Sequence, residues 1–590
     1  MKILLSGAGI TSNTLAHFLP RQGHTLTILE RAPTLRDTGL QIDLRGPGVE
    51  VIRRMGLESA LKEKTIREEG IQVVDRVGRR RAWFPVSSST EGDLLSTSGD
   101  GDGRGVWNGK GKGRKRKNTT LTTEWEVMRG DLCRLLFDSA LKGQEQGKGK
   151  VEYRFGTSID ELHERADGVD VRFSTGEKEE FDLVIGADGQ NSKVRELLIA
   201  ERERQRRLLS QGQQQPQLNQ GQGQDQEAVH GTGHALTDPF KPLGVYAGLF
   251  TTSWPLPTLS DNPSPSSSSS QPQPQPNPDS NKLIGTAYLA PSKRAIFTRR
   301  HHPHRIQVYL FCRTDSPAFA ALRQGHMDPV EEKALLKHHF ADAGWKTDRL
   351  MKALEEAEDF YCERIGFVSM EGWSTLLPSP PASSGSGERD LTGEHGGRDT
   401  TRASYTGGRI VLVGDAAYAP SVTTGMGTTA GVVGAYVLAG EIGKHCTSQI
   451  ASGPAASTRA HHLPSSSSGI EPTRYTPESE PTSTTTPPSI STSNIQQAIL
   501  NYEHNLRPFI TYIQKDLSEG KSAWDSLPQT KFGVGMWNVM LGVCSWLRVD
   551  TFGGWVRDEI YKVKGEKGER GWVLPDYEEE GNYHRLGKRE

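Results

Sequence analysis

Apolar positions in the first thirty residues follow the pattern of two strands joined by a helix. Residues 3–6 and 25–29 form short apolar runs, which are typical of buried strands. Residues 13–19 lie between them and carry apolar side chains at helical spacing. The pattern therefore predicts a βαβ unit with two parallel strands.

Helix and strand patterns alternate along the other apolar blocks. Helical patterns cover 129–141, the Gly- and Ala-rich stretch that ends near 444, and 495–550. The strand-like runs are 169–173, 181–185, 243–251, 283–289, 294–299, 305–313 and 410–413. We expect an α/β plus α+β architecture, with a Rossmann-like nucleotide-binding domain, an inserted antiparallel sheet and C-terminal helices.

Five polar stretches interrupt these blocks. Their Ser-, Gly-, Gln-, Pro- or Lys-rich compositions cannot bury enough apolar surface to offset chain entropy. We therefore expect disordered insertions or linkers at 87–120, 203–235, 255–282, 376–406 and 447–494. The predicted division places nucleotide-binding segments at 1–86, 121–202 and 407–446, a sheet domain at 240–375 and a C-terminal helical region at 495–590.

Charge and cysteine content exclude several classes of protein. Lys and Arg number 71 and Asp and Glu number 72, so the net charge of −1 creates no field that would steer the chain to nucleic acid or to acidic membranes. The five cysteines lie far apart with no CxxC pair, which excludes a disulfide framework and a cysteine zinc site. This usage fits a reducing, cytoplasmic location. No apolar run reaches the roughly 20 residues that a membrane span needs.

A glycine-rich turn lies between the first predicted strand and helix. Gly7 permits the tight turn, and Gly9 lets the backbone approach a pyrophosphate at the helix N-terminus. Glu30 ends the second strand, where an acidic residue accepts a ribose hydroxyl. An acid there disfavours a 2′-phosphate, so the predicted dinucleotide is FAD or NAD. Ser12 replaces the third glycine of the fingerprint, and its small size makes the replacement tolerable.

Two further strands end in small residues and a carboxylate. One runs into Asp188 and Gly189, which could also be an ordinary exit from a strand. The other runs into Asp415, and Gly425 and Gly427 then open a helix. An acid at the carboxyl end of a parallel strand, followed by a helix N-terminus, is typical of a ligand site. The alternative is a glycine-rich contact between helix and sheet.

Together these motifs resemble the single-component flavin-dependent aromatic monooxygenases, the para-hydroxybenzoate hydroxylase-like (class A) group. The likeness is closest to the tetracycline-oxygenase-like branch. It includes the segments at 41–46, 129–132 and 433–441, and it covers the apolar blocks of the chain. The long polar insertions have no counterpart in the family pattern.

The resemblance implies a role for each matching residue. The turn and Glu30 would hold the ADP part of FAD, with Arg31 beside the adenine, and Arg129 would contact the phosphates or the ribityl chain. Asp188 would belong to the element shared between FAD and NAD(P)H, and Asp415 would bind the ribityl chain. The residues assigned to FAD in this way are Gly7, Gly9, Ile10, Glu30, Arg31, Arg45, Arg129, Asp188, Gly189, Asp415, Pro420, Gly425, Gly427 and Thr428.

The resemblance also implies the reaction. NAD(P)H would reduce FAD, and a flavin C4a-hydroperoxide formed with O₂ would oxygenate an aromatic or polyketide-like small molecule. Arg45, the one catalytic candidate, would lie near the isoalloxazine and, with the helix N-terminus at Gly427, would stabilise the anionic reduced flavin. The alternative is that Arg45 is a surface residue in a loop. No second dinucleotide fingerprint is present, which excludes flavoproteins of the disulfide-reductase kind.

The substrate would lie between the nucleotide-binding domain and the predicted sheet. Tyr246, Phe250, Tyr288 and Phe297 could line its pocket, or could simply form the core of the sheet. Other functions on the same scaffold are a flavin-dependent halogenase, whose usual Trp-rich signature is absent, or a reductase. An inactive flavin-binding interaction protein is a further alternative.

Three other features have plainer interpretations. The cluster His301, His302 and His304 predicts a turn between strands, because a metal site would need further ligands. The basic run 111–117 is a solvated charge run more readily than a nucleic-acid patch. The apolar segment 535–549 could touch a membrane interface, but a core helix of a C-terminal cap is favoured. We therefore expect no metal and no nucleic acid partner.

Overall fold

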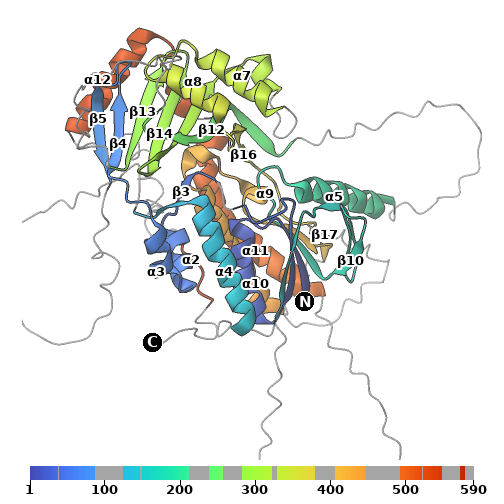
Figure 1. Cartoon of the computed structure of the whole chain (residues 1–590). Coiled ribbons are helices and arrows are strands. Elements are labelled where there is room, and N and C mark those ends of the chain that lie inside the picture. Colours follow the sequence, from blue (N-terminus) through green and yellow to red (C-terminus); the bar gives the residue numbers. More distant parts are fainter. Residues whose placement is uncertain are drawn as a thin grey trace, which may run out of the picture.

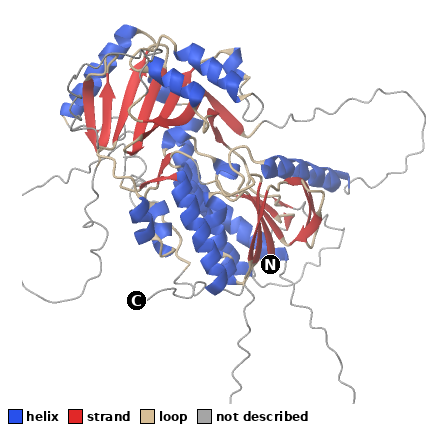
Figure 2. Cartoon of the chain, in the orientation of Figure 1, coloured by secondary structure: helices blue, strands red, loops and turns tan. Residues whose placement is uncertain are grey.

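The computed structural model has mixed α/β content, and its strands gather in two separate groups (Figures 1 and 2). No helix in the described part of the chain has the length and apolar content needed to cross a bilayer. The structure describes residues 1–36, 39–86, 124–146, 149–211, 238–256, 282–321, 328–378, 405–446, 492–520, 523–547 and 572–577.

The first group of strands is a five-stranded parallel sheet in the order β19-β11-β1-β2-β7. Its central strands are buried on both faces, as their continuous apolar runs predict. The carboxyl ends of parallel strands share one edge of a sheet, so the motifs that follow these strands meet there. The strands are β1 (Lys2–Ser6), β2 (Thr25–Glu30), β7 (Val151–Phe155), β11 (Leu183–Gly186) and β19 (Ile410–Leu412).

Long helices pack beside this sheet (Figure 1). Helix α1 follows β1 and packs against α4 and α10. The Gly- and Ala-rich composition of α10 has a packing reason, since a Cβ at Gly434 would clash with the Tyr418 hydroxyl. The helices of this part are α1 (Ile10–Phe18), α2 (Pro47–Arg54), α3 (Glu58–Lys64), α4 (Arg129–Gln146), α5 (Lys193–Gln211), α9 (Asp415–Tyr418), α10 (Gly427–Cys446) and α11 (Thr492–Ser518).

The second group is a seven-stranded sheet in the order β16-β12-β15-β14-β13-β4-β5. All neighbours are antiparallel except β13 and β4. Helices α7 (Pro329–Phe340) and α8 (Thr347–Glu356) cover one face, and α12 (Lys531–Trp546) packs on β5. The strands are β4 (Gly70–Val74), β5 (Arg80–Pro85), β12 (Phe240–Ser253), β13 (Ile284–Ala290), β14 (Arg294–His302), β15 (Arg305–Arg313) and β16 (Tyr361–Val368).

This sheet changes the predicted organisation in one respect. Its strands β4 and β5 come from the first 86 residues, which therefore contribute to both sheets. The reason is a parallel pairing between β4 and β13, in which Ile71 faces Gly285 across more than two hundred residues of sequence. Local apolar patterns carry no signal for such a pairing.

Smaller sheets complete the nucleotide-binding part. The single strand expected at 181–185 is two strands, because Asp182 lies between them and accepts the Lys2 N–H at 2.7 Å. The small elements are β3 (Gln41–Asp43) with β6 (Glu126–Met128), β8 (Ile159–Glu164) with β9 (Val169–Phe173) and β10 (Lys178–Phe181), and β17 (Leu377–Pro378) with β18 (Tyr405–Thr406).

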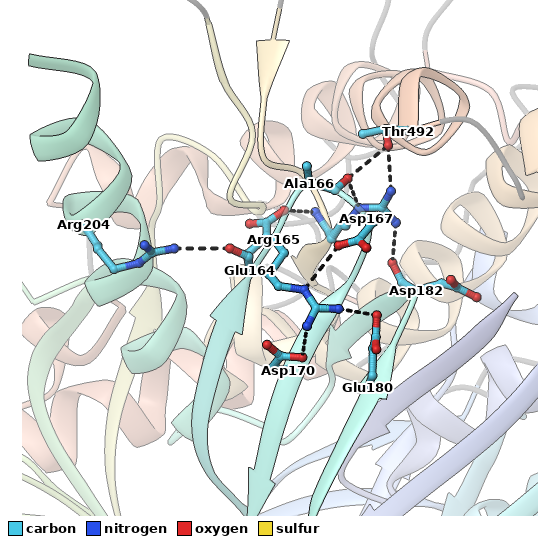
Figure 3. Close-up of polar contacts among 10 residues, drawn as sticks. Glu164, Arg165, Ala166, Asp167, Asp170, Glu180, Asp182, Arg204 and Thr492 are labelled. Atoms are coloured by element: carbon cyan, nitrogen blue, oxygen red, sulfur yellow. Dashed lines mark hydrogen bonds and ion pairs between the residues drawn. The ribbon is translucent and has the colours of Figure 1, made fainter. Parts of the chain in front are cut away.

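A buried arginine connects these pieces. Arg409 precedes β19; its backbone N–H donates to the Glu164 carboxylate at 2.6 Å, and its guanidinium donates to the carbonyl of Asp182 at 2.9 Å and to the hydroxyl of Thr492 at 2.7 Å. Figure 3 shows Glu164 at the end of β8, Asp182 between β10 and β11, and Thr492 at the start of α11 lying around this point. The contacts fix the start of β19 and hence the position of Asp415 after it.

Most of each predicted insertion lies outside the described residues, as does the basic run 111–117. Some short parts of the predicted insertions are described and form helix or strand, and there the prediction of disorder is wrong. Helix α5 continues to Gln211, since the Glu, Arg, Gln and Leu residues of this stretch favour a helix. Strands β17 and β18 occupy 377–378 and 405–406, and α11 begins at Thr492. Within the predicted C-terminal helical region, 572–577 is not helical.

Candidate active site

The glycine turn after β1 is formed by backbone contact with the turn after β11. Gly7 has a φ of +91°, and a Cβ there would lie 2.9 Å from the carbonyl oxygen of Ala187 and from the Cα of Asp188. Its N–H donates to the Leu29 carbonyl at 2.8 Å. Only glycine satisfies both conditions at this position.

Glu30 is held against this turn. One carboxylate oxygen accepts the Ala8 N–H at 3.1 Å and the other accepts the Ala32 N–H at 3.0 Å. Arg31 follows it and is exposed. The carboxylate is therefore fixed in place beside the start of α1, where it can still accept a ribose hydroxyl through its remaining lone pairs.

The N-terminus of α1 is open to an anion. Its N-cap residue is Gly9, which has no side chain to satisfy the first N–H groups, and Ile10 begins the helix. The Arg129 guanidinium approaches this end, with Nη2 3.9 Å from where a Gly9 Cβ would lie. An uncapped helix N-terminus beside a guanidinium suits a phosphate group.

Asp415 begins α9 directly after the turn that follows β19. The residue is exposed to solvent, yet surrounding protein desolvates its carboxyl group and raises the pKa to about 6, while the charge of Arg129 acts in the opposite direction. Its Oδ1 lies 4.0 Å from the position of a Cβ on Gly427, the first residue of α10. Thr428 lies in the same first turn, and Pro420 is buried.

Arg45 lies beside the turn that leads into α10. Its guanidinium carbon is 3.5 Å from where a Cβ would lie on Gly425, which has a φ of +63°. The side chain is 19% exposed and forms an ion pair with Asp43. Arg45 thus lies in a loop but is only partly exposed, and its role at the flavin stays a prediction.

Asp188 is placed differently from the other carboxylates. It accepts the Ser192 hydroxyl at 2.5 Å and the Val194 N–H at 3.1 Å, so its carboxylate faces the first turn of α5. Burial raises its pKa, and these hydrogen bonds oppose the shift. Its backbone contacts Gly7, and Gly189 follows with a φ of +83°. The structure thus brings the backbone of this motif to the glycine turn, but not its carboxylate.

Six of the other predicted residues approach one another in succession, directly or through their chain neighbours, and we call them the cofactor strip. It runs from Glu30 through Gly9, Arg129 and Asp415 to Gly425 and Arg45. Its parts are an acid at one end, an open helix N-terminus with a cation, an accessible carboxylate and a second helix N-terminus. Carboxylates, a guanidinium and open helix N-termini are groups that suit the hydroxyls and phosphates of FAD, so the residues present fit this cofactor.

Sequence reasoning missed the residues that support this strip. The Thr429 hydroxyl accepts the Arg45 N–H at 3.0 Å and so fixes the Arg45 backbone. The Thr11 side chain packs against both Gly414 and Gly431, where a Cβ would lie 2.6 Å from its oxygen. The run of glycines around 414–431 indicates such close contacts, but it does not indicate that Thr11 is their partner.

A buried polar cluster lies between β3, β6 and the seven-stranded sheet. Arg299 forms ion pairs with Glu68 and Glu126, and Gln41 donates to Glu126. Burial raises the pKa of Glu126 to about 8; Arg299 opposes this shift and the charge of Glu68 adds to it. Gln307 accepts the Gln41 N–H at 3.1 Å. We call Arg299, Glu68, Glu126 and Gln41 the interface cluster.

The aromatic residues expected in the substrate pocket lie on two faces. Tyr246, Phe250 and Tyr288 belong to the core under α7 and α8, so the core alternative is confirmed for them. Phe297 lies on the other face, where its ring centroid is 5.6 Å from that of Tyr309. Odd and even positions of a strand face opposite sides, which separates Phe297 from Ile296 and its neighbours in the core.

Two other expectations concern the β14–β15 turn. His301 and His302 end β14 and β15 begins at Arg305, so the predicted turn between strands is confirmed. Within the described ranges, no three His, Cys, Asp or Glu side chains are grouped to hold a metal ion. A cavity of about 640 Å³ lies beside this turn; Lys64, Arg67 and Arg305 are among its lining residues, together with Asp131.

Comparisons with known proteins agree with this site. Residues 1–217 match the family of FAD binding domains. Together with the fold, these matches show an FAD-binding domain and a likeness to FAD-dependent monooxygenases, in agreement with the resemblance found in the sequence.

Two of the relatives are named as monooxygenases. The FAD-dependent monooxygenase asL4 of Sarocladium schorii is 29% identical over 580 residues, covering 98% of each chain. The flavin-dependent monooxygenase eupH of Phoma sp. is 29% identical over 454 residues, covering 75% of this chain and 77% of the relative.

Two solved structures share the fold. One is the tetracycline destructase Tet(51), with a TM-score of 0.53, 18% identity and 98% coverage of both chains. The other is Klebsiella pneumoniae HpxO complexed with FAD and uric acid, with a TM-score of 0.51, 14% identity, and coverage of 95% of this chain and 96% of HpxO.

Proposed function

We propose that this protein is a monooxygenase that uses NAD(P)H and O₂ to place one oxygen atom on an aromatic or polyketide-like small molecule. The balanced reaction consumes substrate, NAD(P)H, a proton and O₂, and yields oxygenated substrate, NAD(P)⁺ and water. The observation that carries the proposal is the cofactor strip, whose Arg45 follows β3, where the Gln41 N–H donates to Gln307 of the seven-stranded sheet. The fold likeness to a tetracycline destructase makes tetracycline-like polycyclic compounds suitable first probes.

The protein would bind and orient the cofactor through the residues described above. Bound FAD would supply hydride acceptance and oxygen activation. Glu30, Arg129 and Asp415 would hold its ribose, phosphates and ribityl chain. Arg45 and the N-terminus of α10 at Gly427 would provide positive potential at the ring, which favours negative charge there.

The substrate would lie against the sheet face that carries Phe297. Tyr309 and Phe311 lie on the same face, and the Trp524 ring centroid is 5.0 Å from that of Phe311. The Tyr309 hydroxyl donates to Gln307 at 3.0 Å. This face combines flat apolar surface with a few polar groups, as pockets for aromatic ligands do. It would also keep water from the reacting atoms.

The cavity beside the β14–β15 turn is the candidate entry for NAD(P)H. Its cations Lys64, Arg67 and Arg305 suit a dinucleotide that carries negative phosphates. Lys64 pairs with Asp131 at 3.7 Å, while Arg67 and Arg305 have no ion-pair partner in the described part of the chain. Replacing Arg67 or Arg305 with alanine should raise the KM for NAD(P)H and leave FAD content unchanged.

One experiment separates this function from its alternatives. The purified protein should show bound FAD in its absorption spectrum, and a substrate should accelerate NAD(P)H oxidation with one oxygen atom from ¹⁸O₂ in the product. An inactive flavoprotein would bind FAD but leave NAD(P)H unoxidised. A reductase would oxidise NAD(P)H without labelled product, and a halogenase would need chloride or bromide for product formation. A reducing, cytoplasmic location remains part of the proposal.

A further inference from the structure

Helix α12 contacts the rest of the protein through one narrow face. Only Asn538 and Leu541 of this helix are buried. Ser545 accepts the Trp83 N–H at 3.0 Å and donates to the Trp83 carbonyl at 2.8 Å, which binds the helix to the edge strand β5. The helix lies beside β5 at the outer edge of the sheet (Figure 1). The prediction of a core helix is therefore wrong.

The opposite side of α12 is apolar and exposed. Seven large apolar side chains, spaced three or four positions apart or adjacent along the helix, are between 43% and 82% exposed. A surface helix normally turns polar residues outward, so a continuous apolar stripe marks a site of interaction. We call this set the α12 outer face: Phe532, Met536, Val539, Met540, Val543, Trp546 and Leu547.

Cations surround the α12 outer face. Lys531 begins the helix, and Lys293 lies next to it, since its N–H donates to the Pro528 carbonyl at 3.2 Å. Arg80 on β5 is exposed and has no ion-pair partner among the described residues. The helix itself contains no acidic residue. The surface thus combines apolar side chains with unpaired positive charge.

We propose that the α12 outer face docks on an anionic lipid bilayer. An apolar helix face with Trp and Phe side chains enters the boundary between headgroups and acyl chains, and nearby Lys and Arg residues attract anionic headgroups. The 16 residues of α12 give a helix of about 24 Å. It would lie in the plane of the membrane surface, because its other side is attached to β5.

A second copy of this chain fits the same surface less well. In a two-fold dimer the same surface patch meets itself. Arg80, Lys293 and Lys531 of one copy would then face the same cations of the other, and the interface would have no carboxylates from α12 to balance them. The charge therefore favours an anionic partner, and the apolar stripe favours a lipid one.

Vesicle flotation of the full-length holoenzyme tests the proposal. The wild-type protein should float with phosphatidylcholine vesicles that contain phosphatidylserine, and less with phosphatidylcholine alone. Val539→Glu/Val543→Glu should weaken binding more than about tenfold, because both positions would place charge in the acyl region. Arg80→Glu/Lys531→Glu should abolish the preference for phosphatidylserine. Val330→Glu/Leu208→Glu is the matched control, since both side chains are equally exposed but far from α12.

The result that overturns the proposal is equally specific. Absence of flotation with both vesicle types would do so, and so would equal flotation of wild type and Val539→Glu/Val543→Glu. A wild-type dimer in sedimentation that this variant converts to a monomer would assign the surface to a second copy instead. FAD content and melting temperature should match wild type in every variant, since all the changed side chains are exposed.

Discussion

Arg299 of β14 forms an ion pair with Glu126 of β6, and the pair is buried where the small β3–β6 sheet meets the seven-stranded sheet. The neighbouring strand β3 leads directly to Arg45. The Arg299 guanidinium thus pairs with two carboxylates, Glu126 and Glu68, at a buried site where charged groups carry a desolvation penalty. The contact makes the position of Arg45 depend on the seven-stranded sheet.

The raised pKa of Glu126 predicts a pH-dependent stability. Its pKa is about 8 in the folded protein and near 4.5 when unfolded, so its contribution is fully present at low pH and is lost as pH rises between these values. Glu126→Gln should remove that slope, which is at most about 1.4 kcal/mol per pH unit. Urea unfolding at pH 5 and pH 9 measures it. Glu63→Gln, at an exposed site, should leave the slope unchanged.

The glycine turn predicts two different costs for the same substitution. Gly7→Ala combines a positive φ with a backbone clash against Ala187, and should abolish FAD binding and lower the melting temperature. Gly156→Ala has a similar φ of +67° but no atom within 4 Å. It should cost only about 1–2 kcal/mol. If the two variants bound FAD with the same affinity, FAD binding would not depend on the close approach of Gly7 to the Ala187 backbone.

Asp415 predicts a pH-dependent affinity for FAD. Because its pKa is raised to about 6, the carboxylate is available above this pH and is lost as pH falls below it. Wild-type affinity should therefore fall from pH 8 to pH 5. Asp415→Asn should bind about tenfold more weakly at pH 8 and vary less, since a hydrogen bond to a charged group is lost. If fluorescence titration gave the same pH dependence of FAD affinity for the two proteins, Asp415 would not contact the cofactor.

Replacing Asp188 should lower the stability of the protein rather than its affinity for FAD. Asp188→Ala removes the acceptor for Ser192 and Val194 at the start of α5, and should cost about 1–2 kcal/mol. Ser192→Ala should cost less when Asp188 is already absent, because the two act on the same helix end. FAD affinity should change little in both variants. A large loss of FAD from an otherwise stable Asp188→Ala protein would show that the carboxylate reaches the cofactor.

The sequence allowed prediction of the parts that depend on local signals. The turn at Gly7, the acid at Glu30 and the strand before Asp415 each follow from a short pattern and the shared edge of a parallel sheet. The pairing of β4 with β13 and the meeting of Arg299 with Glu126 join residues far apart in the chain, which no periodicity encodes. The exposure of α12 depends likewise on where β5 lies.

The pair β17–β18 has a practical consequence. Leu377 pairs with Thr406 and Pro378 with Tyr405, so the chain returns after 379–404 to the place from which it departed. The entropy cost of closing a loop grows only slowly with its length. Residues 379–404 can therefore be replaced by a longer stretch while both anchoring strands stay in register. A reporter domain inserted between Pro378 and Tyr405 should therefore leave the flavin-binding residues in place.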